Sequence, residues 1–106
     1  MKKQLITIKM KNGHEIQVIA LCQGGLAVHR DIHDADKWSI TWVKNGIFID
    51  DRNPLCSIAK DKVVKLLSIA DWEEITPKDI TRNNSLRENI LFAVERPAHL
   101  KVSSKV

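Results

Sequence analysis

The densest group of chemically versatile side chains in this 106-residue chain runs from His29 to Asp34. If a strand continues through this segment, His29, Asp31 and His33 project from the same side, because side chains alternate along a strand. Two imidazoles and a carboxylate are ligands that suit Zn²⁺. A simpler interpretation is a polar turn, since aspartates such as Asp31, Asp34 and Asp36 bond to nearby backbone N–H groups. A His-x-Asp-x-His metal site is therefore an alternative, and the leading interpretation needs no cofactor.

Two short motifs of known enzymes occur, but their partner motifs are missing. Residues 29–31 spell the His-Arg-Asp of protein kinases, without the glycine-rich loop or the Asp-Phe-Gly triplet. Ser57 and Lys60 form a Ser-x-x-Lys motif, without the Lys-Thr-Gly that accompanies it in its known users. Ser57 is explained more simply as the N-cap of a helix. We therefore expect that the protein is not an enzyme.

Two tryptophans share one face of a predicted strand. Trp38 and Trp42 alternate with Ser39 and Thr41, and Ile40 lies between them on the same side. Two such rings could stack the bases of a single-stranded nucleic acid or anchor a protein interface. They could equally form the core beneath a helix. The sequence leaves open which face of the sheet is buried.

The net charge of +4 comes from the two ends of the chain. Residues 12–95 hold ten basic and 13 acidic residues. The first and last eleven residues contain no acid and seven basic residues, namely Lys2, Lys3, Lys9, Lys11, Arg96, Lys101 and Lys105. A weak, sequence-independent contact with nucleic-acid phosphates through the lysines of this set is therefore a second hypothesis for function.

Cysteine use and hydropathy favour a cytoplasmic location. Cys22 and Cys56 are far apart and fit no metal-binding spacing, so we expect two reduced thiols, although their pairing is left open. No apolar run reaches the roughly 18 residues of a membrane span, and the basic start lacks a signal-peptide pattern. We expect no contact with membranes.

The first half of the chain has the alternation of strands. The predicted strands cover residues 4–10, 15–21, 26–30, 37–43 and 47–49. Asn12-Gly13 and Asn45-Gly46 between apolar runs are typical of tight hairpin turns. Because sequential strands usually pair, this half predicts an antiparallel meander of four to five strands.

The second half changes to helical periodicity. Residues 58–70 carry an apolar stripe and predict a helix capped by Ser57. Thr76 and Pro77 predict the start of a short helical turn. Ser85 and Glu88 form a capping box that opens a helix ending at or before residue 97. Residues 98–106 lack any pattern and predict a flexible basic tail after a single domain of residues 1–97.

These elements predict an α+β fold in which two C-terminal helices pack on one face of the meander. The other face would then be left to solvent or to a partner. Free edge strands also leave a homodimer open.

The segments GLAVHR (residues 25–30) and WSITWVKNG (residues 38–46), followed by a helix, resemble small uncharacterised proteins of bacteriophages and mobile elements. The resemblance covers roughly residues 14–72. Trp42 stands where those proteins would have a histidine. The resemblance implies that the protein originates from a bacteriophage or a mobile element, and it implies no particular chemical reaction.

The leading hypothesis is a non-enzymatic binding module, an inhibitor or accessory factor that occupies a surface of a larger host protein or nucleoprotein. The side chains expected to contact this partner come from the polar turn, the tryptophan strand and the first helix: His29, Asp31, His33, Asp34, Trp38, Trp42, Lys62 and Lys65. The nucleic-acid alternative uses Lys2, Lys3, Lys9, Lys11, Lys101 and Lys105 with a tryptophan surface. The metal alternative uses His29, Asp31 and His33.

Overall fold

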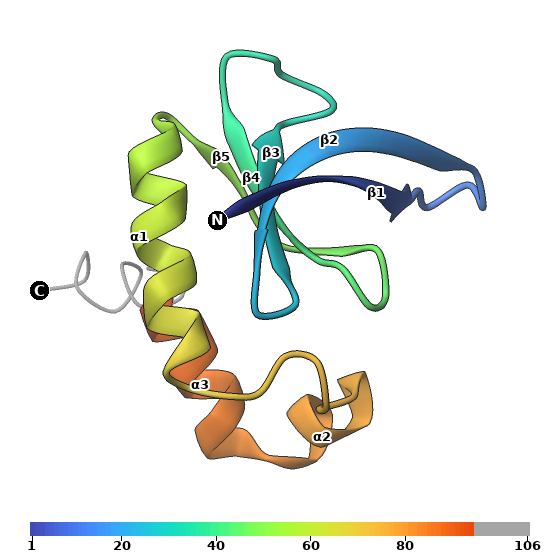
Figure 1. Cartoon of the computed structure of the whole chain (residues 1–106). Coiled ribbons are helices and arrows are strands. Elements are labelled where there is room, and N and C mark those ends of the chain that lie inside the picture. Colours follow the sequence, from blue (N-terminus) through green and yellow to red (C-terminus); the bar gives the residue numbers. More distant parts are fainter. Residues whose placement is uncertain (95–106) are drawn as a thin grey trace, which may run out of the picture.

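The structure, a computed structural model, describes residues 1–94, which form a five-stranded antiparallel sheet followed by helices (Figure 1). The strands are β1 (Lys2–Lys9), β2 (Glu15–Gln23), β3 (Leu26–Arg30), β4 (Trp38–Trp42) and β5 (Ile47–Asn53). The helices are α1 (Cys56–Leu67), α2 (Pro77–Arg82) and α3 (Asn84–Ala93). Each strand pairs with the next, so the predicted α+β meander is confirmed. The predicted tail and the domain boundary at residue 97 lie outside the described residues.

Both Asn-Gly pairs lie in the hairpin turns that they predict. Gly13 and Gly46 adopt φ values of 86° and 68°, a region that glycine enters without steric cost. The N–H of Gly46 donates to the carbonyl of Trp42 at 2.8 Å, which closes the turn between β4 and β5. At Gly46 a Cβ atom would lie 2.9 Å from the carbonyl oxygen of Thr7, so the close approach of β1 also requires glycine here.

The sheet curls so that apolar side chains are buried on both of its faces. Ile6 and Ile8 of β1 pack with Ala27 of β3 in a cluster on the face away from α1. The N–H of Lys9 donates to the carbonyl of Gly46 at 2.9 Å and joins the end of β1 to the turn before β5. The expectation of one fully open face is therefore wrong, because the curled first hairpin covers much of it.

The main core lies between the other face and the helices. Helix α1 contacts β3, β4 and β5, and α3 contacts α1. The strands contribute Leu26, Val28, Ile40 and Trp42 to this core, and the helical half contributes Ala59, Val63, Leu66, Trp72, Ile90, Ala93 and Val94. The amphipathic stripe of α1 is thus buried as predicted.

The junction between β5 and α1 differs from the prediction. Strand β5 runs on to Asn53, past its predicted end at residue 49, and Arg52 takes a positive φ of 60° within it. Helix α1 then begins at Cys56, after Leu55, which makes no side-chain capping bond. Ser57 lies inside the first turn, so its prediction as the N-cap is wrong. The longer strand delivers the chain to the helix start without an intervening polar cap.

The caps of the two later helices are side-chain bonds. Thr76 accepts a bond from the N–H of Asp79, and the Asp79 carboxylate accepts one from Thr76 in return, which confirms the predicted start at Pro77. Before α3, Asn83 Oδ1 accepts a bond from the N–H of Leu86 at 3.0 Å. Asn83 is therefore the cap in place of the predicted Ser85, which lies inside the helix.

Cys22 and Cys56 are free and half-buried in the structure. Burial raises the pKa of the Cys22 thiol. Within residues 1–94, no helix combines the length and apolar character that crossing a membrane requires.

Candidate functional site

His29 is buried and uses both ring nitrogens. Its side chain is 1% exposed, with Nδ1 2.6 Å from the carbonyl oxygen of Arg30 and Nε2 2.6 Å from Oγ1 of Thr41. A carbonyl oxygen only accepts, so Nδ1 carries the proton and the Thr41 hydroxyl donates to Nε2. Burial lowers the pKa of His29, although the Arg30 carbonyl and the charge of Asp31 oppose the shift. The imidazole is therefore neutral, in one defined tautomer.

A hydroxyl that donates to an imidazole is the geometry of a base-activated nucleophile. Thr41, however, is as fully buried as His29, and the ring of Phe48 lies 6.1 Å from the imidazole. No substrate reaches the Thr41 oxygen in this arrangement. The pair instead bonds β3 to β4 within the sheet.

Asp31 organises the polar turn that follows β3. Its Oδ1 accepts bonds from the backbone N–H groups of His33 at 2.7 Å and Asp34 at 3.1 Å. Its Oδ2 accepts a bond from the Ser39 hydroxyl at 2.9 Å. Burial alone would raise the pKa of Asp31, but these bonds outweigh burial and lower it. Asp31 is therefore a turn-forming residue, and His33 and Asp34 are left exposed at the loop.

The structure does not bring His29, Asp31 and His33 together as metal ligands. Strand β3 ends at Arg30, so the alternation that would align them stops before His33. The nitrogens of His29 and the oxygens of Asp31 already have partners. Within residues 1–94, no group of three or more His, Cys, Asp or Glu side chains is arranged to hold a metal ion.

The two predicted contact tryptophans lie on the helix side of the sheet. Trp42 is fully buried, meets Trp72 edge to face at 5.3 Å, and donates from Nε1 to the Trp72 carbonyl at 2.7 Å. It therefore offers no surface to a partner. Trp38 is half-buried against the same core, and the guanidinium of Arg30 lies 4.5 Å from its ring centre. The two rings form no stacking platform.

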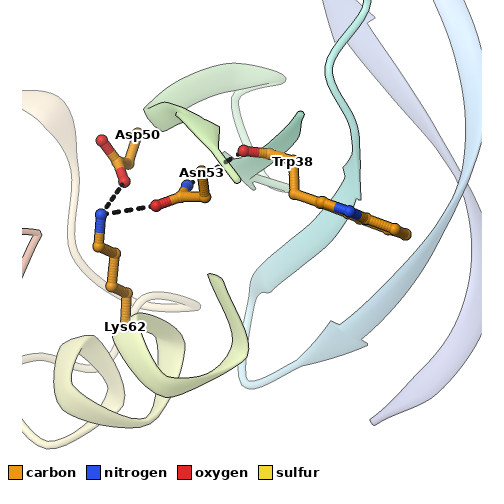
Figure 2. A network of polar contacts seen from close by, with 4 residues as sticks. All are labelled: Trp38, Asp50, Asn53 and Lys62. Atoms are coloured by element: carbon orange, nitrogen blue, oxygen red, sulfur yellow. Dashed lines mark hydrogen bonds and ion pairs between the residues drawn. The ribbon is translucent and has the colours of Figure 1, made fainter. Parts of the chain in front are cut away.

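Lys62 and Lys65 lie on the same helix but in different surroundings. Lys62 reaches from α1 toward β5, where Nζ donates to Asp50 Oδ2 at 3.0 Å and to Asn53 Oδ1 at 2.6 Å (Figure 2). Asn53 in turn donates to the carbonyl of Trp38 at 3.1 Å. The side chains of Lys62 and Asp50 are 13% and 5% exposed, so this ion pair ties α1 to the sheet. Lys65 is exposed and remains accessible to a partner.

The hairpin of β1 and β2 carries the most exposed apolar pair of the sheet and reaches away from α1 (Figure 1). Leu5 and Ile19 lie opposite each other across the ladder and are 61% and 66% exposed. Strand β1 is also an edge of the sheet. The N–H of Lys9 points away from β2 to reach Gly46, so the backbone groups of Lys3 and Leu5 point the same way by alternation. We call this combination of apolar pair and edge the β1 surface.

A pocket of about 420 Å³ opens where the tip of this hairpin meets the polar turn and β5. We call it the hairpin pocket. Its lining consists of Lys9, Met10, Lys11, Asn12, His33, Phe48 and Asp51. The pocket brings together residues of different hypotheses, since Lys9 and Lys11 belong to the nucleic-acid set and His33 belongs to the partner-binding and metal sets.

The remaining lysines of the nucleic-acid set are placed differently. Lys2 and Lys3 are exposed at the start of β1. Lys2 lines a second pocket of about 530 Å³ that also includes Lys44 and Glu73. Lys101 and Lys105 lie outside the described residues. The described lysines of the set thus lie along one strand and its turn.

No protein-family model matches the chain, and no curated protein or solved structure is significantly similar to it.

Sequence reasoning missed Phe48 and the pair of Leu5 and Ile19. Phe48 lies in the short predicted strand of residues 47–49, and the sequence patterns assign no role to Phe48, Leu5 or Ile19. One signal was available, because Leu5 and Ile19 lie on the faces opposite to Ile6, Ile8 and Val18. A hairpin that is apolar on both faces, with lysines flanking it, indicates that one face packs on the core and that the other can contact a partner.

Proposed function

We propose that this protein is a non-enzymatic binding module that attaches to a larger protein through the β1 surface. The observation that carries the proposal is the exposed cross-strand pair of Leu5 and Ile19 beside an open strand edge. Apolar pairs in this position normally pack against a neighbouring element. An exposed edge with apolar side chains is a template for an added strand.

The charge of the strand indicates the kind of segment that it accepts. Lys2, Lys3 and Lys9 are exposed along β1, and residues 1–11 contain no acid. A second copy of β1 would place lysines against lysines, which disfavours an antiparallel homodimer through this edge. An extended partner segment with acidic residues flanking an apolar centre would match both the charge and the apolar pair.

The resemblance to small proteins of bacteriophages and mobile elements supports an inhibitor or accessory factor of this kind. In this proposal the partner is a host protein or nucleoprotein of the cytoplasm, where Cys22 and Cys56 would stay reduced.

The test is affinity capture from a native host lysate with nuclease treatment, using wild-type protein, Leu5→Lys and Ile19→Lys. The matched control is Val64→Lys, since Val64 is an equally exposed apolar residue, 62%, on α1. We expect wild type and the control to retain the same protein and both hairpin variants to lose it. Capture that survives in Leu5→Lys and Ile19→Lys, or that disappears with nuclease, would refute the proposal.

A further inference from the structure

Hydrogen bonds hold the three segments around the hairpin pocket in place. The Lys9 N–H bonds to the carbonyl of Gly46, which anchors the end of β1. The side chain of Asn12 accepts a bond from the N–H of His14 at 3.0 Å, which shapes the hairpin tip. Asp31 fixes the backbone of His33 on the opposite loop. The pocket is therefore a preformed feature of the fold.

The lining combines an apolar part with an excess of basic groups. Met10 and Phe48 are half-buried and pack against the cluster of Ile6, Ile8 and Ala27 on the face away from α1. This packing sets their positions. Lys9 and Lys11 are exposed at the hairpin, and within residues 1–94 neither forms an ion pair. Asp51 is the one acid of the lining and comes from β5. A bound anion is thus favoured on the hairpin side of the pocket.

We infer that the hairpin pocket binds one nucleotide unit, with the base against Phe48 and Met10 and the phosphate near Lys9 and Lys11. A planar, partly apolar group joined to an anion matches this lining, and about 420 Å³ lies in the range of small-ligand pockets. Base stacking on an aromatic side chain beside lysines is the usual mode of single-strand recognition. The pocket shares Lys9 with β1 but includes neither Leu5 nor Ile19, and the inference does not depend on the proposed function.

The experiment measures fluorescence anisotropy of a short fluorescein-labelled oligothymidylate titrated with the full chain at about 50 mM salt. Lys11→Glu removes one lysine of the pocket. Lys60→Glu, at an exposed position on α1, changes the net charge by the same amount and is the matched control. We expect Lys11→Glu to weaken binding about tenfold or more, and the control to change it far less.

A second variant tests the aromatic contact. Phe48→Leu keeps an apolar side chain in the cluster and removes the stacking ring. We expect it to weaken binding about tenfold, while far-UV circular dichroism reports that the fold is retained. A titration with thymidine monophosphate, followed by the NMR chemical shifts of the pocket amides, distinguishes a free nucleotide from a nucleic-acid strand as the ligand. Changes in these chemical shifts indicate that the pocket binds a free nucleotide. Binding of the oligonucleotide without such changes indicates that the pocket binds one unit of a nucleic-acid strand.

Three results would overturn the inference. One is the absence of binding to both probes at about 50 mM salt. Another is an equal loss in Lys11→Glu and Lys60→Glu, which would indicate net charge without a site. The last is displacement of the oligonucleotide by polyglutamate at the same charge concentration, which would indicate an acidic peptide as the occupant.

Discussion

The buried, neutral state of His29 makes the stability of the protein depend on pH. In the unfolded chain a histidine has a pKa of about 6.5. In the folded protein burial lowers the pKa of His29, and both ring nitrogens are already bonded in the neutral tautomer. As the pH falls through about 6.5, the unfolded state therefore takes up a proton before the folded state does. The stability contributed by His29 is complete above this pH and is lost below it.

The size of the effect follows from the linkage of one proton. A single group changes the free energy of unfolding by at most about 1.4 kcal/mol per pH unit. Between about pH 7.5 and about pH 5.5, protonation linked to His29 can lower the free energy of unfolding by up to about 1.4 kcal/mol. Only the pH unit between about 6.5 and about 5.5 contributes, because it lies below the pKa of the unfolded state. The lowered pKa of Asp31 acts in the same direction, but its window begins near the ordinary value of 3.8 and continues below it. The two effects are therefore separable.

Urea denaturation followed by far-UV circular dichroism at both pH values measures this difference. His29→Gln lowers the stability at both pH values, since the imidazole bonds are lost, but it should abolish most of the change between them. His33→Gln, in the exposed loop, is the control and should keep the change of the wild type. A pH dependence that persists undiminished in His29→Gln would show that the buried imidazole is not its source.

Two further predictions concern the core. Lys62→Met should lower the free energy of unfolding by about 2–4 kcal/mol, because the buried carboxylate of Asp50 loses its ammonium partner, whereas Lys65→Met should change it by less than about 0.5 kcal/mol. Equal urea midpoints for the two variants would contradict the role of the ion pair. Trp72→Phe removes the bond from Nε1 to the carbonyl of Leu66 and part of a fully buried ring, so a loss of about 2–3 kcal/mol is expected in urea denaturation. A loss below about 1 kcal/mol would count against that bond.

Much of the fold follows from local patterns. Alternation places Ile6 and Ile8 on one side of β1, and the two Asn-Gly turns then force neighbouring strands to pair. The stripe of α1 likewise selects its buried face. These features depend on residues close together in the chain, so no knowledge of the rest of the molecule is needed.

The ends of the helices were less predictable because several residues near each start can act as caps. Asn83 and Ser85 both have suitable side chains, and the structure uses Asn83. Ser57 could cap α1, but β5 extends further than its apolar pattern suggests, and the helix begins two residues earlier than predicted. The choice depends on where the preceding segment ends, which is a property of packing.

The sequence by itself determined the antiparallel meander, the amphipathic first helix and the turn formed by Asp31, since short-range bonding and periodicity specify them. Only the tertiary structure decided which side chains a ligand can reach. The sheet curls until Lys9 bonds to Gly46, and the hairpin pocket opens where the hairpin tip meets the polar turn and Phe48. Trp42, a surface candidate in the sequence, becomes core because α1 packs on its face of the sheet. Curvature and helix docking result from contacts between residues far apart in the chain, and no local pattern specifies them.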